Sequence, residues 1–293
     1  MGESMIKQEY KNLKLCAFAD EADQNLDGQI IALKENDISL LEIRGVNGKN
    51  ISELTVPEVK DAKAKLDDAG IKVWSIGSPV GKIDINEPFE PHLDLFCRLL
   101  ETAHTLKASH FRLFSFYGTD GGMEDEVFER LDCFVQKAQG SDVLLCHENE
   151  SGIYGDISQR CLRIHKQFPS IKAVFDPANF IHCSEDTMEA WDILCPYVEY
   201  LHIKDAMPDG TVVPAGHGIG NIRTIIDQFA KKEDIFTEGT LTLEPHLSKF
   251  VGLKELEGIR KESKIGSLSY SNQREAFDAA VEALKEILQW NHI

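Results

Sequence analysis

Cationic residues are scarce in this chain, and their scarcity limits what it can bind. The 293 residues include 31 lysines and arginines against 49 aspartates and glutamates, giving a formal net charge of −18. Nucleic acids and anionic membrane surfaces require a basic face, so neither is an expected partner. No apolar run approaches the roughly 20 residues needed to span a bilayer, and the polar amino terminus lacks a signal-type apolar segment. The sequence therefore predicts a cytoplasmic protein.

Paired cysteines and a glycine-rich phosphate fingerprint are also missing. The seven cysteines are scattered, odd in number and contain no Cys-x-x-Cys pair, so neither a disulfide framework nor a zinc knuckle is indicated. Cys16 and Cys146 lie inside apolar segments and are expected to fill the core. No Gly-x-Gly-x-x-Gly follows the first predicted strand, which weakens the case for a doubly wound dinucleotide-binding fold.

Short apolar strands instead alternate with amphipathic helices along the whole chain. The predicted strands cover residues 15–20, 40–45, 72–77, 110–116, 143–150, 171–176, 198–205 and 241–246. With 42% hydrophobic residues the chain can bury a large core, and no shift in composition marks a linker. Alternation predicts a parallel sheet, and eight units predict its closure. We therefore expect an α/β fold, a single (β/α)₈ TIM barrel that forms one domain over residues 1–293.

Four of the predicted strands lead directly into ionisable residues, which are Glu148, Asp176, His202 and Glu244. The carboxyl ends of barrel strands meet at one face, where ligands bind, so these four side chains are expected to converge. Without a cation, three clustered carboxylates would repel one another and take up protons. Three carboxylates and one imidazole suit Mn²⁺, Mg²⁺ or Co²⁺, with Zn²⁺ also possible. The sequence thus predicts a site for one divalent metal ion.

The same strand ends resemble a known group of proteins. The segments that carry the resemblance are HEN at 147–149, FDPANF at 175–180, LHIKD at 201–205 and LEPH at 243–246. They are similar to the xylose isomerase-like TIM-barrel superfamily, which includes sugar epimerases such as D-tagatose 3-epimerase, hydroxypyruvate isomerase, inosose dehydratase and endonuclease IV. The resemblance covers nearly the whole chain. It implies that Glu148, Asp176, His202 and Glu244 bind the metal, and that Glu148 and Glu244 also move the proton in catalysis.

The sequence departs from parts of that superfamily. The sugar epimerases have a substrate-contacting histidine three residues after the metal-binding aspartate, and Asn179 stands there in this chain. Endonuclease IV builds a three-metal cluster with further histidines at other strand ends, whereas here the third and fourth strands end on Gly77-Ser78 and Ser115. We therefore expect one metal ion, and DNA repair is not an expected function.

Further residues are candidates for the site. Lys204 shares its strand face with His202, so it either holds a substrate oxygen or phosphate or pairs with Asp205. Glu42 is expected near the rim, where it would bind a substrate hydroxyl, and Arg44 in a buried ion pair between barrel strands. His217 lies in a glycine-rich loop predicted to cover the site. With Asn179, the residues Glu42, Lys204 and His217 complete the expected substrate-binding set.

The expected function is that of a metal-dependent isomerase or epimerase of a small sugar or related polyhydroxy carbonyl compound. The ion would acidify the carbon-bound proton and stabilise an enediolate. Two carboxylates on opposite sides of that carbon give epimerisation, and one base moving the proton between neighbouring carbons gives isomerisation. A dehydratase of a cyclitol-like ketone and a non-catalytic sugar-binding barrel stay open as alternatives. The expected partner is a small carbohydrate, and a homo-oligomer is compatible with the sequence.

Overall fold

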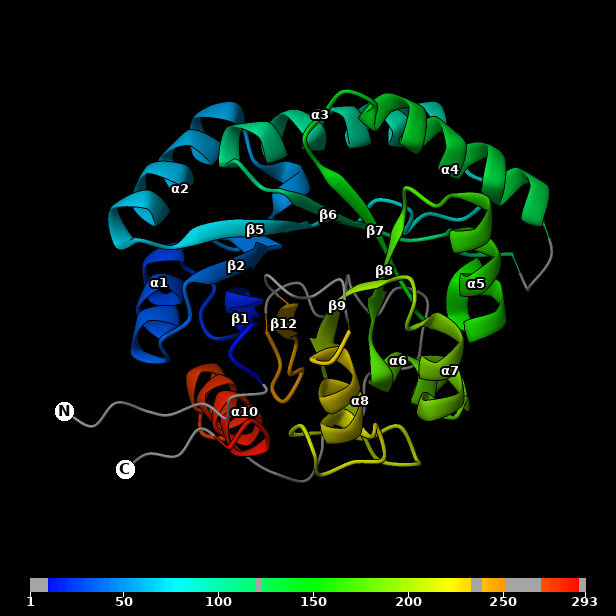
Figure 1. Cartoon of the computed structure of the whole chain (residues 1–293). Coiled ribbons are helices and arrows are strands. Elements are labelled where there is room, and N and C mark those ends of the chain that lie inside the picture. The colour runs from blue at the N-terminus through cyan, green and yellow to red at the C-terminus, as the bar shows by residue number, and fades with distance from the viewer. Residues whose placement is uncertain (1–9, 120–122, 233–238, 251–269, 290–293) are drawn as a thin grey trace.

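Eight parallel strands form a closed barrel, which confirms the expected (β/α)₈ TIM barrel (Figure 1). The computed structural model describes residues 10–119, 123–232, 239–250 and 270–289. Around the barrel the strands follow the order β1-β12-β9-β8-β7-β6-β5-β2. Their bounds are Leu13–Ala17 (β1), Leu40–Ile43 (β2), Lys72–Gly77 (β5), His110–Leu113 (β6), Leu144–Glu148 (β7), Lys172–Phe175 (β8), Val198–Ile203 (β9) and Gly239–Leu243 (β12).

Helices surround the ring of strands on its outer side (Figure 1). Their bounds are Leu26–Glu35 (α1), Val56–Ala69 (α2), Glu90–Leu106 (α3), Glu124–Ala138 (α4), Ser158–Gln167 (α5), Pro177–His182 (α6), Thr187–Leu194 (α7), Ile222–Phe229 (α8) and Gln273–Ile287 (α10). Among the described residues, no helix is both long enough and apolar enough to cross a bilayer.

The short helix α6 was not expected from the sequence, which predicted one helix, α7, after the sixth strand. Helix α6 begins immediately after β8 because Asp176 caps it: the carboxylate accepts a hydrogen bond from the backbone N of Asn179 at 3.1 Å. Pro177 occupies the first turn, where its missing N–H costs nothing. The cap fixes the Asp176 side chain at the end of its strand.

The first and fourth barrel strands are shorter than predicted. Strand β1 ends at Ala17, and the chain then turns through a short 3₁₀ helix at Ala19–Glu21. Strand β6 ends at Leu113, after which the backbone N of Phe114 donates to Val80 outside the barrel ladder. The turn after β1 buries the carboxylates of Asp20 and Glu21 beside the barrel mouth rather than exposing them to solvent.

The lower interior of the barrel is filled by a compact cluster of side chains. It consists of Cys16, Trp74, Cys146, Val174 and Tyr200. Cys16 and Cys146 are fully buried, as the sequence predicted, and the Trp74 and Tyr200 rings meet edge to face at 4.7 Å. A barrel whose interior is packed in this way is not a pore. The ionisable residues therefore lie above an apolar floor.

The loop that follows β9 is held by a single carboxylate. Asp205 starts a two-stranded hairpin of β10 (Asp205–Ala206) and β11 (Val212–Val213). Its Oδ2 accepts from the backbone N of Gly216 and of Gly218, both at 2.9 Å. Its Oδ1 accepts from the backbone N of Ala206 at 2.9 Å and of Gly220 at 2.8 Å. These four hydrogen bonds order the glycine-rich segment in which sequence analysis placed His217.

Candidate metal centre

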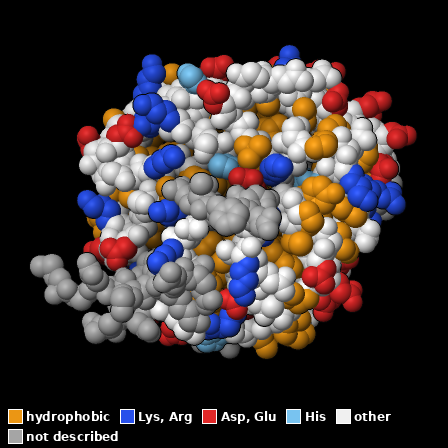
Figure 2. Space-filling model, in the orientation of Figure 1, with side chains coloured by type: hydrophobic (Ala, Val, Ile, Leu, Met, Phe, Trp, Pro, Cys, Tyr) orange, Lys and Arg blue, Asp and Glu red, His pale blue; other side chains and the backbone are white. Residues whose placement is uncertain are grey.

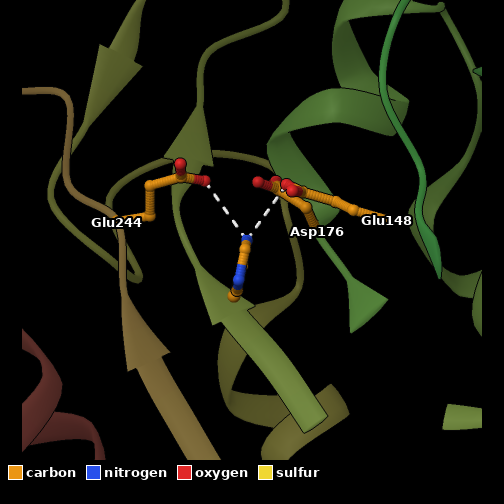
Figure 3. A group of neighbouring side chains, drawn as sticks. Glu148, Asp176 and Glu244 are labelled. Atoms are coloured by element: carbon orange, nitrogen blue, oxygen red, sulfur yellow. Dashed lines mark hydrogen bonds and ion pairs between the residues drawn. The ribbon is translucent and has the colours of Figure 1, made fainter. Parts of the chain in front are cut away.

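Glu148, Asp176, His202 and Glu244 converge as the sequence predicted. One ligand atom from each lies within 4.8 Å of the others, and all four side chains are buried. The Nδ1 of His202 lies 3.0 Å from Glu148 Oε1 and 3.2 Å from Glu244 Oε2. Figure 3 shows the three carboxylates pointing toward one another from separate elements. On the face shown in Figure 2, acidic, basic and histidine side chains gather near its centre.

This donor set fits a divalent cation. Three carboxylates and one imidazole nitrogen are hard or borderline ligands of the kind that Mn²⁺, Mg²⁺ and Co²⁺ accept. Glu148 Oε2 and Asp176 Oδ2 accept no well-aligned hydrogen bond and are met instead by ion pairs, with Arg112 Nη1 at 3.1 Å and with Lys204 Nζ at 2.7 Å. Burial raises the pKa of Asp176 to about 7, and the negative charges of Glu244 and Glu148 act in the same direction. A cation among these oxygens would remove the cause of that shift.

Two asparagines hold the carboxylates of the centre in place. The Nδ2 of Asn179 donates to Glu148 Oε1 at 3.3 Å and to the backbone O of Asn149 at 2.9 Å. Asn149 in turn exchanges two hydrogen bonds of 2.9 Å with the backbone of Asp176. Asn179 thus contacts a proposed ligand directly, while its expected contact with substrate stays a prediction.

Lys204 lies inside the centre, and the alternative pairing with Asp205 is wrong. Its Nζ is 2.7 Å from Asp176 Oδ2 and 3.0 Å from Glu244 Oε2. Asp205 is instead engaged with the backbone of its own loop. Burial lowers the pKa of Lys204, but Asp176 and Glu244 outweigh it and raise that pKa well above its ordinary value. Lys204 is therefore a charged ammonium within the cluster.

Arg44 forms the expected buried ion pair, and it also reaches the centre. Its Nε donates to Asp20 Oδ2 at 2.9 Å, and its Nη2 donates to Asp20 Oδ1 at 3.0 Å and to Glu21 Oε1 at 3.1 Å. Its Nη1 donates to Glu244 Oε1 at 2.9 Å. One guanidinium therefore bridges three buried carboxylates, so the orientation of Glu244 depends on Arg44.

Arg112 is a member of the site that sequence analysis missed. Its Nη1 lies 3.1 Å from Glu148 Oε2 and 3.7 Å from Glu244 Oε1. Its guanidinium stacks on the Phe18 ring at 5.0 Å, and that of Arg44 stacks on the same ring at 4.2 Å. The sequence feature that could have indicated Arg112 is its charge at an inward-facing position of β6, between the apolar residues Phe111 and Leu113.

His246 and Glu21 form a polar wall beside Glu244. The His246 Nε2 is 3.5 Å from Glu21 Oε1 and from Glu244 Oε1, and these three residues offer a second donor set for a metal. Arg44 already donates to the same two oxygens. A second cation there would lie against a buried guanidinium, which is electrostatically unfavourable. We therefore assign no metal to this group.

Glu42 lies lower in the barrel than predicted. Its side chain is 0% exposed, so the expected position at the rim is wrong. Its Oε1 accepts from the Tyr200 hydroxyl at 3.0 Å and from Ser75 Oγ at 3.3 Å, while its Oε2 lies 3.3 Å from His202 Nε2. Burial raises the pKa of Glu42, but the positive charge of His202 and of Arg112 outweighs burial and lowers that pKa overall. Glu42 contacts the His202 ring on the side opposite to Glu148.

His217 is exposed in the loop that Asp205 holds. Its backbone N donates to Pro214 O at 3.0 Å, and no contact of its imidazole with the four converging residues is found in the described part of the chain. Its expected contact with substrate stays a prediction.

The lysine and arginine charges of the site do not balance its carboxylates. The buried network contains six carboxylates and three lysine or arginine cations, namely Asp20, Glu21, Glu42, Glu148, Asp176 and Glu244 with Arg44, Arg112 and Lys204. A surplus of three negative charges in a buried region is costly unless it is met by protons or a metal ion. A single divalent ion would compensate most of the surplus.

Comparison with known proteins places the chain in a family. The family model described as xylose isomerase-like TIM barrel matches residues 32–286. No curated protein sequence matches the chain.

Solved structures with the same fold cover almost the entire chain. The probable 3-DHS dehydratase AsbF from Bacillus anthracis has a TM-score of 0.67 at 16% identity and covers 93% of this chain and 98% of its own. The IolI protein with a bound zinc atom has a TM-score of 0.70 at 15% identity, and the match covers 96% of this chain and 100% of the IolI chain. D-Psicose 3-epimerase from Clostridium cellulolyticum H10, solved with D-tagatose, has a TM-score of 0.67 at 16% identity, and the match covers 94% of this chain and 98% of the epimerase chain. At these identities the likeness shows the fold alone.

Proposed function

Because the chain belongs to the xylose isomerase-like TIM barrel family, we propose that it is a divalent-metal-dependent isomerase or epimerase of a small sugar or related polyhydroxy carbonyl compound. The observation that carries the proposal is the buried convergence of Glu148, Asp176, His202 and Glu244. These residues would hold Mn²⁺, Mg²⁺ or Co²⁺, and Zn²⁺ is also compatible with them. The zinc atom bound to the IolI protein and the sugar in the D-psicose 3-epimerase structure support this assignment.

A bound divalent ion would supply positive charge where negative charge develops on the carbonyl oxygen of the substrate. Glu148 and Glu244 are the proposed proton-transfer groups. One carboxylate removes the proton from the carbon beside the carbonyl, breaking that C–H bond and leaving the electron pair on the substrate. In epimerisation the other carboxylate returns a proton to the opposite face of the same carbon. In isomerisation one carboxylate delivers the proton to the former carbonyl carbon, and the hydroxyl proton of the deprotonated carbon is transferred to the former carbonyl oxygen.

Lys204 is the proposed substrate-binding cation. Its ammonium shares Asp176 Oδ2 and Glu244 Oε2 with the donor set for the metal, so the ion and the ammonium compete for the same two oxygens. With the ion bound, the ammonium has N–H groups to donate to a substrate oxygen. Arg44 and Arg112 keep Glu244 and Glu148 oriented throughout.

Proton exchange in heavy water tests the proposal. The Mn²⁺-loaded protein is incubated in D₂O with a panel of ketoses, aldoses and inososes, and the products are read by NMR and mass spectrometry. An isomerase or epimerase incorporates deuterium at the carbon beside the carbonyl without loss of water. Deuterium-free recovery of every compound, with no new product, would contradict a catalytic role and favour a sugar-binding barrel.

Dehydration of a cyclitol-like ketone is the second candidate. The likeness to a probable 3-DHS dehydratase supports it, because the first step is the same removal of a proton beside a carbonyl. In a dehydratase the resulting electron pair instead expels a β-hydroxyl group, which takes up the abstracted proton and leaves as water. Loss of one water, about 18 mass units, from an inosose would distinguish dehydration from isomerisation.

A further inference from the structure

The contact between Glu42 and His202 lies on the side of the imidazole that faces away from the other proposed ligands. The ring has two nitrogens, and each faces a different group of carboxylates. Nδ1 lies 3.0 Å from Glu148 Oε1 and 3.2 Å from Glu244 Oε2, so it is directed into the candidate metal centre. Nε2 lies 3.3 Å from Glu42 Oε2. Nδ1 therefore faces the proposed metal ligands, whereas Nε2 faces Glu42 alone among the carboxylates of the described residues.

Glu42 is itself held from below by the floor of the barrel. The Tyr200 hydroxyl and Ser75 Oγ both donate to its Oε1, at 3.0 and 3.3 Å, which leaves Oε2 for the imidazole. The Tyr200 ring packs edge to face on Trp74 at 4.7 Å, so the phenol is fixed by the apolar floor. Glu42 and His202 are both 0% exposed. A chain of contacts thus runs from the floor of the barrel to the candidate metal centre.

We propose that Glu42 is a positioning residue that accepts a hydrogen bond from the Nε2–H of His202 and thereby presents Nδ1 to the divalent ion. This inference rests on the proposed metal-dependent function. It assigns Glu42 no contact with substrate, in place of the substrate role expected from the sequence. A neutral imidazole carries its proton on either nitrogen, and only the Nε2–H form leaves the Nδ1 lone pair free for a metal. A carboxylate beside Nε2 selects that form and increases the basicity of the ligating nitrogen.

The chain contains a matched control for this contact. His110 Nε2 lies 3.3 Å from Glu199 Oε1, the same distance as in the Glu42 pair. The two pairs also join neighbouring parts of the same barrel, since Glu199 and His202 both belong to β9. The Glu199 side chain is 34% exposed and His110 is not one of the four converging residues. Loss of the Glu199 contact therefore removes a histidine–carboxylate pair without touching the metal centre.

Metal affinity measures the proposed role directly. Mn²⁺ binding to the wild-type chain, Glu42→Gln, Glu42→Asp and Glu199→Gln is measured by isothermal titration calorimetry. Removing a carboxylate partner of a metal-binding histidine typically weakens metal affinity about 10- to 100-fold. We expect that loss in both Glu42 variants, because the amide lacks the charge and the shorter aspartate does not reach the ring. Glu199→Gln is expected to bind Mn²⁺ like the wild-type chain.

A second measurement separates positioning from a general effect on folding. Long-range ¹H–¹⁵N spectra of the Zn²⁺-loaded protein report the state of each ring nitrogen. We expect a protonated Nε2 and a metal-bound Nδ1 for His202, with the Nε2 resonance displaced in Glu42→Gln and unchanged in Glu199→Gln. Thermal unfolding of the metal-free variants shows whether each one is folded.

The possible outcomes separate this inference from the proposed function. Mn²⁺ binding by the wild-type chain with unchanged affinity in both Glu42 variants would overturn the inference alone. A protonated Nδ1 on the His202 of the Zn²⁺-loaded protein would do the same. Failure of the wild-type chain to bind Mn²⁺ or Zn²⁺ would overturn the metal-dependent function, and the role of Glu42 with it.

Discussion

The Nζ of Lys204 lies 2.7 Å from Oδ2 of Asp176, so an ammonium already sits against one of the proposed metal ligands. The same nitrogen is 3.0 Å from Glu244 Oε2. Both oxygens belong to buried carboxylates, where opposite charges interact strongly. The positive charge of Lys204 stabilises the carboxylates in the absence of metal and opposes the binding of a divalent ion.

Replacing Lys204 with methionine is therefore expected to strengthen metal binding while reducing turnover. Removal of one positive charge beside a divalent ion relieves a repulsion on the order of a few kcal/mol, and we expect at least about tenfold tighter Mn²⁺ binding. Turnover falls because the proposed contact with the substrate oxygen is lost. Calorimetry measures the first effect and the D₂O assay the second. Lys49→Met, which removes an exposed lysine paired with Glu58, is the control. Weaker Mn²⁺ binding in Lys204→Met would contradict the competition.

The protonated groups of the metal-free centre are expected to contribute less stability as the pH rises through neutrality. Burial raises the pKa of Asp176 to about 7. Burial also lowers the pKa of His202, but Glu148, Glu42 and Glu244 outweigh it, so that pKa is well above its ordinary value. Both groups thus hold protons in the folded state that the unfolded chain releases. The stability that these protons contribute is present at acid pH and is lost as the pH rises, from about 4 to about 7 for Asp176 and above about 6.5 for His202.

Mn²⁺ is expected to reverse this dependence, because a metal ion binds the deprotonated ligands. Buried histidines elsewhere, such as His92 and His165, whose pKa values burial lowers to about 4, have the opposite dependence on pH with or without the metal. The test is therefore the increase in melting temperature caused by Mn²⁺, which should be larger at pH 8 than at pH 5.5. The pKa of Glu244 is lowered despite its burial, chiefly by Lys204, so its own contribution changes only in more acidic solution, outside this window. Differential scanning calorimetry of the metal-free and the Mn²⁺-loaded protein at several pH values measures this increase. An increase that is equal at the two pH values or smaller at pH 8 would rule the account out.

A paired comparison of Glu244 and His202 distinguishes proton transfer from metal binding. Glu244→Gln keeps a ligating oxygen but cannot act as a base, so turnover should fall on the order of a hundredfold to ten-thousandfold even with saturating Mn²⁺. His202→Ala should act mainly through weaker metal binding, with activity partly recovered at high Mn²⁺. Steady-state rates over a range of Mn²⁺ concentrations separate the two effects. Near-native activity of metal-saturated Glu244→Gln would show that Glu244 is not the base.

Arg44 is expected to be essential for stability. Its guanidinium pairs with Asp20, Glu21 and Glu244, all of which are buried. Arg44→Met leaves these carboxylates without their shared partner, and removing one partner of a buried pair costs about 3–5 kcal/mol. Urea unfolding of the metal-free protein measures the loss. Arg163→Met, which removes an exposed arginine paired with Glu124, should cost less than about 1 kcal/mol. Equal costs for the two variants would show that the Arg44 network is not stabilising.

The sequence predicted four residues at the ends of regular strands, but it missed Arg112 inside β6 and two carboxylates where the backbone is irregular. Glu148 and His202 lie within β7 and β9, and Asp176 and Glu244 follow directly after β8 and β12. Side-chain alternation along a strand was enough to bring these four together. Asp20 and Glu21 were missed because the chain leaves β1 at Ala17 and turns through a 3₁₀ helix, a change that alternation does not reveal.

Glu42 shows a different limit of sequence analysis. The alternation of side chains along the strand correctly places Glu42 inside the barrel, but its expected position along the barrel axis, near the rim, is wrong. Height depends on how each strand is staggered against its neighbours, and the β2–β5 register shifts between Leu41 and Glu42. Such a shift is a property of strand pairing and leaves no pattern in either strand alone. For the same reason the contact of Glu42 with His202, 160 residues away, is apparent only in the structure.

The anchoring of the 206–220 loop by Asp205 has a consequence for how this protein could diversify. The carboxylate binds backbone N–H groups, so the hold does not depend on the side chains of Met207, His217 or Ile219, which are exposed. Gly218 is different, since a Cβ there would lie 2.3 Å from the backbone O of Ala206. The backbone of the loop is thus fixed by Asp205, while its exposed side chains can vary. Randomising its exposed positions while keeping Asp205 and the glycines is therefore expected to leave the backbone of the loop in place.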